Sequence, residues 1–234
     1  YLRSKGYDSE NPWHDFANSA EGPDGEILSG WHMRYADLPA RVAEEHSETP
    51  YMTNRAMDFI RDAGKDPSCM HLSFIKPHWP YVAPAPYHSM FGIDDIKPVV
   101  RSQEERGNPH PVIAAFMDQN ETREFQRDDV IEKVIPTYMG LVKQIDDNIG
   151  HLMTFMEEQG RLDDTLIVFT SDHGDFLGDH WLGEKQLFHD PSARIPMVIV
   201  DPDPAADGTR GTVDERLVEA IDLLPTFIEV TGGK

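Results

Sequence analysis

The chain has 234 residues, which is enough for one large domain or two small ones, and 39% of them are hydrophobic, which supports a real core. Asp and Glu outnumber Lys and Arg by 42 to 21, and the resulting net charge of −21 argues against nucleic acid and anionic membranes as partners. No apolar run reaches membrane-spanning length and the first residues lack a signal-peptide core, so we expect a cytoplasmic protein. Because the chain starts at Tyr1 without a methionine, it looks like an internal part of a longer protein.

The first elements are an irregular stretch followed by a helix. Residues 1–46 are rich in Gly, Pro, Asn and aromatic residues with little periodicity, which is typical of an excursion that packs on a scaffold. Thr49 as N-cap and Pro50 in the first turn predict a helix start, and Gly64 predicts its end.

A strand and a stiff loop are expected next. Residues Met70–Ile75 (MHLSFI) predict a strand, and the adjacent Cys69 is interpreted as a small buried hydrophobe. The lone cysteine excludes an intrachain disulfide and fits a reducing compartment. Two prolines flank His78 in the following KPHWPY loop, and a rigid loop is suited to aiming an imidazole at a site. Residues 82–127 are rich in proline and expected to be irregular, with a possible substrate-facing or oligomer contact.

The second half predicts regular α/β units. Apolar residues spaced three and four apart predict a helix over 128–158, which Pro136 should break or kink and Gly160 should end. The apolar run 166–170 predicts a strand buried on both faces of a parallel sheet. Two further elements are expected, a strand over 196–200 and a helix capped by Asp222 within 218–230.

Chemistry-bearing residues gather directly after the 166–170 strand. Ligands of open α/β sheets sit outside the carboxyl ends of strands, where Asp172 and His173 supply a carboxylate and an imidazole suited to a divalent cation. Lys185 follows across two glycine turns, and its ammonium could neutralise a phosphoryl or sulfuryl oxygen. On residues alone, each of these groups could equally be a capping carboxylate, a packed histidine or a solvated lysine.

Several longer sequence segments together resemble a known family, although no single residue in them would show it. SDHGDFLGDHWLGEK and LFHDPSARIPMVIVDP, together with KPHWPY, YMGLVKQIDDNIG and AIDLLPTF, closely resemble the sulfatase branch of the alkaline phosphatase superfamily. Within that branch they look most like the phosphonate monoester hydrolases. The resemblance covers nearly all of residues 1–234, and it implies an α/β fold with a mostly parallel sheet flanked by helices on both faces, truncated at both ends.

The resemblance also implies roles for individual residues. Asp172 and His173 would bind the active-site cation, which could be Mn, Ca, Fe or Zn. Lys185 and His78 would be catalytic, neutralising the transferred group and assisting departure of the alcohol. Asp175 and His180 would support the loop through second-shell bonds. The implied reaction is metal-dependent hydrolysis of small phosphonate monoesters, phosphate diesters or sulfate esters, and a homo-oligomer is left open.

The nucleophile is the main gap in this account. The family uses a cysteine in a Cys-x-Pro/Ala-x-Arg context that is oxidised to formylglycine, and Cys69 stands in no such context. We therefore expect the nucleophile and further metal ligands to lie outside this chain and the chain alone to be inactive. The alternatives are a plain sulfatase, a mutase or phosphodiesterase with a Ser or Thr nucleophile, and a non-catalytic acidic module that binds cations or a partner.

Overall fold

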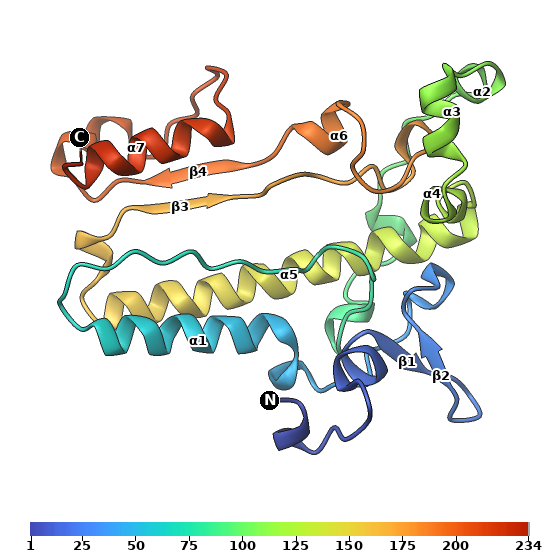
Figure 1. Ribbon diagram of the computed structural model, residues 1–234, viewed down its shortest axis with the longest axis horizontal. Helices are drawn as coiled ribbons and strands as arrows, with labels where there is room; N and C mark the ends of the chain where they lie inside the picture. Colours follow the sequence, from blue (N-terminus) through green and yellow to red (C-terminus); the bar gives the residue numbers. More distant parts are fainter. Residues whose placement is uncertain (234) are drawn as a thin grey trace.

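The protein is described by a computed structural model covering residues 1–233 (Figure 1). The helices are α1 (Glu48–Ala63), α2 (Gln103–Gly107), α3 (Pro111–Met117), α4 (Asn120–Glu124), α5 (Asp128–Glu158), α6 (Asp190–Ala193) and α7 (Leu223–Val230). The strands are β1 (Ser19–Glu21), β2 (Ile27–Ser29), β3 (Ile167–Thr170) and β4 (Met197–Val200). Within residues 1–233, every helix is too short or too polar to cross a membrane.

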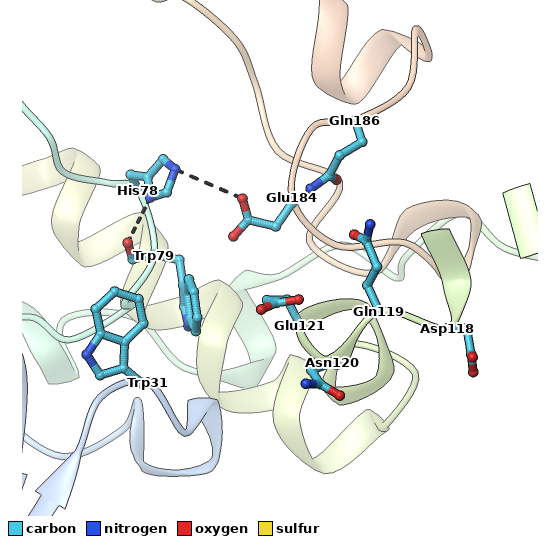
Figure 2. Close-up of a pocket in the computed structure, with 9 residues that line it drawn as sticks. All are labelled: Trp31, His78, Trp79, Asp118, Gln119, Asn120, Glu121, Glu184 and Gln186. Atoms are coloured by element: carbon cyan, nitrogen blue, oxygen red, sulfur yellow. Dashed lines mark hydrogen bonds and ion pairs between the residues drawn. The ribbon is translucent and has the colours of Figure 1, made fainter. Parts of the chain in front are cut away.

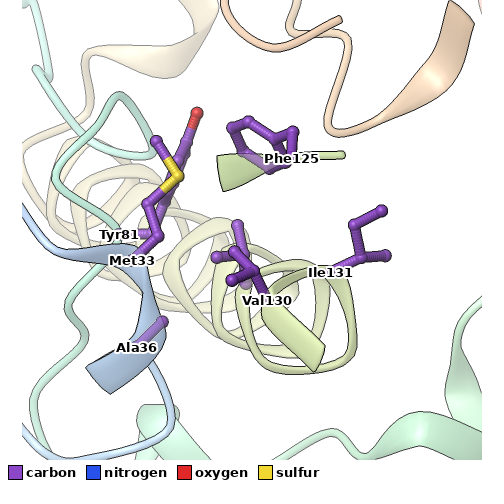
Figure 3. Packing of buried hydrophobic residues seen from close by; sticks show 7 residues of the cluster. Met33, Ala36, Tyr81, Phe125, Val130 and Ile131 are labelled. Carbon is purple, nitrogen blue, oxygen red and sulfur yellow. The ribbon is translucent and has the colours of Figure 1, made fainter. Parts of the chain in front are cut away.

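Helix α5 is the central packing element of the fold, and its predicted bounds are confirmed. At one end it packs on α1, where Ala56 and Ile60 meet Leu152 and Met156. A second hydrophobic cluster lies at its other end, and Figure 3 shows members of that cluster packed around the first turns of the helix. The cluster contains Met33, Ala36, Tyr81, Phe125, Val130, Ile131 and Val134. Long-range packing from three parts of the chain therefore fixes α5.

Two details of the helix predictions are wrong. Helix α1 begins at Glu48 with Ser47 in the N-cap position, and Thr49 is a buried residue inside the first turn. Pro50 can sit in that turn because the first N–H groups of a helix have no internal partner. Helix α5 continues through Pro136, which lies buried within the 31-residue helix, so the predicted break is wrong and the alternative of a kink stays a prediction.

The strand pairing differs from the predicted arrangement. Strand β3 pairs with β4 antiparallel, with Ile167 opposite Val200 and Thr170 opposite Met197. The other pair in the described chain, β1 and β2, is also antiparallel. Burial of the 166–170 run on both faces is wrong, because β3 is only partly buried and Phe169 is exposed. Apolar content predicted the strand correctly, but burial needs elements that cover both faces.

The segment between α1 and the proline-flanked loop is extended without being a strand. Figure 1 shows it running beside α5 and β3, yet residues Met70–Ile75 form no ladder, so the predicted strand is wrong. Leu72 packs against the α1–α5 cluster, whereas Met70 and Ile75 are exposed. Cys69 is exposed too, which corrects its interpretation as a buried hydrophobe.

Candidate functional site

The loop that follows β3 is folded tightly back on the chain. The Gly174 N–H donates to the Ser192 carbonyl at 2.7 Å, and a Cβ at Gly174 would lie 2.0 Å from the Pro191 carbonyl oxygen. Only glycine permits this approach, so Gly174 is required where the chain leaves the strand end. Phe176 and Leu182 are buried in a cluster with Met117 and anchor the middle of the loop.

The second half of this loop has a strained backbone. The non-glycine residues with positive φ are Leu177, His180, Trp181 and Glu184. Such conformations persist only where surrounding contacts impose them. The Trp181 ring lies 4.2 Å from the guanidinium of Arg101 and 4.9 Å from that of Arg106, and its Nε1–H donates to the Ser102 carbonyl at 2.6 Å. These contacts hold the loop whose next residues carry Lys185.

His78 and Lys185 meet although they are 107 residues apart in the sequence. His78 Nδ1 donates to the Trp79 carbonyl at 2.7 Å, because a carbonyl can only accept. Nε2 is then left with a lone pair, which accepts a hydrogen bond from Lys185 Nζ. The Lys185 ammonium also lies 3.1 Å from Glu184 Oε2. The two side chains predicted to be catalytic are therefore in direct contact.

The predicted metal ligands lie beside this pair. The His173 and His78 rings are 5.7 Å apart between centroids. His173 Nδ1 donates to the Gly174 carbonyl at 2.7 Å, which leaves its Nε2 lone pair free, 3.8 Å from Asp172 Oδ2. The Asp172 side chain is exposed. This oxygen and nitrogen suit a divalent cation as two of its ligands, and the tautomer has the form that metal-binding histidines adopt.

Further donors are not assembled around this couple within the chain. Among residues 1–233, no group of three or more His, Cys, Asp or Glu side chains converges in a way that could hold a metal ion. A cation bound by Asp172 and His173 would therefore need further donors.

A buried acid lies behind the site. Asp175 accepts hydrogen bonds from the Tyr81 hydroxyl at 2.6 Å and from the Leu177 N–H at 3.0 Å. Burial raises the pKa of Asp175 to about 6, and the hydrogen bond from Tyr81 acts in the opposite direction. Burial also raises the pKa of Tyr81, as does the Asp175 carboxylate. This pair ties the proline-flanked loop to the loop after β3.

His180 lies apart from the His78–Lys185 pair. Its Nδ1 donates to Glu105 Oε1 at 2.7 Å, and its ring stacks on His189 with centroids 4.4 Å apart. The hydrogen bond from His180 is the main cause that lowers the pKa of Glu105. These contacts join the loop to α2.

A pocket of about 680 Å³ opens beside His78 (Figure 2). Its wall includes Trp31, His78 and Trp79 and the acidic residues Asp118, Glu121 and Glu184. Sequence reasoning did not single out Glu184, although its place next to Lys185 in the Gly-Glu-Lys string was a usable signal. It also missed Trp31, which nothing in its local sequence connects with the KPHWPY loop.

Comparison with known proteins assigns the family. The sulfatase family model matches residues 1–233, so the chain belongs to the sulfatase family. It is 34% identical over 210 residues to a multifunctional alkaline phosphatase superfamily protein, PehA, of Trinickia caryophylli. That match covers 85% of this chain and 40% of the relative. An arylsulfatase of Clostridium perfringens is 30% identical over 205 residues, covering 83% of this chain and 40% of that protein.

Solved structures agree on the fold. The phosphonate monoester hydrolase of Silicibacter pomeroyi superposes with a TM-score of 0.82 at 27% identity, covering 100% of this chain and 46% of that one. The phosphonate monoester hydrolase of Agrobacterium radiobacter gives 0.79 at 26% identity, with coverages of 99% and 46%. The predicted alkaline phosphatase and sulfatase fold is therefore confirmed. The chain spans less than half the length of these relatives.

Proposed function

We propose that the protein takes part in metal-dependent hydrolysis of phosphonate monoesters, phosphate diesters or sulfate esters. The observation that carries the proposal is the meeting of Lys185 with His78 next to His173. A tetrahedral anion gains most from cations and donors that are already in place where its charge develops. The relatives named above include an arylsulfatase and phosphonate monoester hydrolases, which supports both sulfur and phosphorus as the transferred centre.

Lys185 is proposed to hold the transferred group. Its ammonium donates to His78 Nε2 and lies against Glu184, so it is positioned without a substrate. An anionic oxygen that replaced the imidazole as acceptor would gain a charge-assisted hydrogen bond. His78 would then be released, and once protonated at Nε2 it could pass that proton to the departing alcohol oxygen.

Asp172 and His173 are proposed to hold a divalent cation of the Mn, Ca, Fe or Zn type. When bound, such an ion supplies positive charge that lowers the cost of the developing anion. Asp172 would contribute a carboxylate oxygen and His173 its free Nε2, with other donors completing the shell. Sulfatases typically combine such a metal with a formylglycine nucleophile, and we expect the same pairing in the complete enzyme.

Metal titration tests the cation site. Asp172→Asn and Asp163→Asn remove the same charge from exposed positions, and only the first lies in the proposed site. Calorimetry with Mn²⁺ should give a site that Asp172→Asn weakens roughly tenfold or more and that Asp163→Asn leaves unchanged. Equal effects of both substitutions, or loose binding at many sites, would instead support an acidic cation-binding module.

Turnover tests the reaction. The complete enzyme should be assayed with aryl sulfate, phosphonate monoester and phosphodiester substrates, comparing Lys185→Ala with Lys97→Ala, which changes a lysine outside the site. Removing a group that stabilises the transition state costs on the order of 100- to 1000-fold in rate. Turnover that survives Lys185→Ala unchanged would exclude the role proposed for this residue.

A further inference from the structure

We propose that the pocket beside His78 receives the alcohol portion of the ester and selects alcohols that carry an ammonium group. This inference rests on the proposed function, because it places the leaving group relative to the proposed catalytic pair. His78 lines the pocket and accepts a hydrogen bond from Lys185. A transferred group held at Lys185 therefore directs its alcohol into this space, and about 680 Å³ is ample for a small alcohol.

One wall of the pocket is aromatic. The Trp31 and Trp79 rings meet edge to face, with centroids 4.4 Å apart at an interplanar angle of 85°. Trp31 Nε1–H donates to His14 Nδ1 at 3.0 Å, which fixes the orientation of the indole. Trp79 packs on the buried cluster at the start of α5. Rigid indole faces attract cations through the negative face of the ring, with tryptophan the strongest of the aromatic side chains.

The facing walls are acidic. Glu184 has a side chain only 10% exposed; its Oε2 lies 3.1 Å from the Lys185 ammonium, and its Oε1 has no hydrogen-bond partner within the described chain. Figure 2 shows its carboxylate turned toward His78, with Glu121 below it on the same side of the aromatic pair. Glu121 makes no ion pair in the part of the chain that the structure describes, whereas Asp118 is bound to Arg123 at 2.6 Å and points away.

The charge of the residues that line the pocket determines which alcohols it favours. None of the described residues that line the pocket is Lys or Arg. A buried carboxylate oxygen without a partner is costly, and a nearby cation relieves that cost. An ammonium group would lie between the indoles and the two glutamates, whereas an anionic alcohol would meet repulsion there. The pocket therefore favours cationic over neutral alcohols and rejects anionic ones.

Binding of the free alcohol tests the pocket separately from hydrolysis. Calorimetry should compare a hydroxyethyl-trimethylammonium ion with dimethylbutanol, its neutral analogue in which carbon replaces nitrogen. We expect the cation to bind roughly tenfold more tightly, as cation–π attraction and a carboxylate together supply. Trp31→Leu and Glu121→Gln should each reduce this ratio severalfold. Glu132→Gln makes the same charge change on the exposed face of α5 and should leave the ratio unchanged.

The outcomes separate the two proposals. Equal binding of the charged and neutral alcohols, or a preference that Glu121→Gln and Glu132→Gln reduce equally, would overturn the pocket assignment. Circular dichroism of each variant guards against loss of folding. If the cation binds through Trp31 and Glu121 but the complete enzyme turns over no ester, the pocket assignment stands as a cation site and the proposed hydrolysis fails. If esters are turned over without preference for cationic alcohols, the hydrolysis stands and the pocket assignment fails.

Discussion

The helical body around α5 and the region that contains β3, β4 and α7 both carry many apolar side chains, but they differ in how far these are buried. In the body, apolar side chains such as Val130, Val134 and Leu141 are completely buried. In the other unit, Val198, Ile199 and Leu224 are exposed, and so is most of α7. Periodicity and apolar content predict which segments become helices and strands. They predict burial only where the chain itself supplies the opposing surface.

The candidate site lies across these two regions. Asp172 and His173 follow β3 directly, whereas His78 comes from the loop whose neighbour Tyr81 is buried against α5. Lys185 joins them through a loop anchored by Phe176 and Leu182. His78 is thus carried by a loop that packs on the helical body, whereas Asp172 and His173 belong to the less covered region.

The largest expected contrast comes from one substitution made in both regions. Leu141→Ala in α5 and Leu224→Ala in α7 remove the same atoms from a helix. Leu141 is fully buried, so its loss should lower the free energy of unfolding by about 2–5 kcal/mol. Leu224 is exposed, and its loss should change stability by less than about 0.5 kcal/mol. Denaturant titrations measure both, and equal effects would show that α7 is covered in solution.

A second contrast lies within the body. A Cβ at Gly140 would lie 2.1 Å from the backbone oxygen of Tyr87, whereas one at Gly150 would meet open space. Gly140→Ala must push two backbones apart and should destabilise the protein by about 1–3 kcal/mol. Gly150→Ala should stabilise it by up to about 1 kcal/mol through helix propensity. Thermal unfolding of the two variants should shift in opposite directions, and shifts in the same direction would contradict the packing of α5 on Tyr87.

A third contrast, in pH dependence, concerns an ammonium group turned into the helical body. Lys76 Nζ donates to Asn18 Oδ1 at 3.0 Å and to the Pro80 carbonyl at 2.5 Å. Burial lowers the pKa of Lys76 to about 8, with the Glu48 carboxylate opposing that shift. Between about pH 8 and the ordinary value of 10.5, the unfolded state therefore holds a proton that the folded state has lost.

Stability contributed by this group should consequently rise with pH over that interval and be flat below it. The rise should be on the order of 2 kcal/mol after allowance for partial accessibility of the residue. Lys76→Met removes the titration, so the stability difference between wild type and variant should change by this amount from pH 8 to 10.5. Other titrating groups are common to both proteins and cancel. A difference that is independent of pH would mean that the Lys76 ammonium is well solvated.

The limits of sequence reasoning can be seen at particular residues. The bounds of α5 were predictable because eight turns of apolar spacing outweigh one proline, whereas Thr49 and Ser47 are equally good caps locally and tertiary packing chose between them. Residues 70–75 have strand composition, but strands are defined by partners that local sequence does not name.

The candidate site likewise has residues that could be identified from the sequence and contacts that could not. Asp172 and His173 could be found from their place after an apolar run, and Lys185 and His78 from the family resemblance. Their contact across 107 residues, and the Tyr81–Asp175 hydrogen bond, depend on how two loops pack. The pocket was hidden because Trp31, Glu121 and Glu184 come from three distant segments.

The left-handed residues between 177 and 184 have a consequence for protein engineering. Each such conformation costs about 1–3 kcal/mol, so glycine or asparagine at Leu177 or Glu184 would relieve the backbone and make the protein more heat-resistant. The same substitutions would give the segment that carries Lys185 more conformational freedom. Selection for thermostability alone should therefore accumulate substitutions within residues 177–184 and loosen the contact of Lys185 with His78.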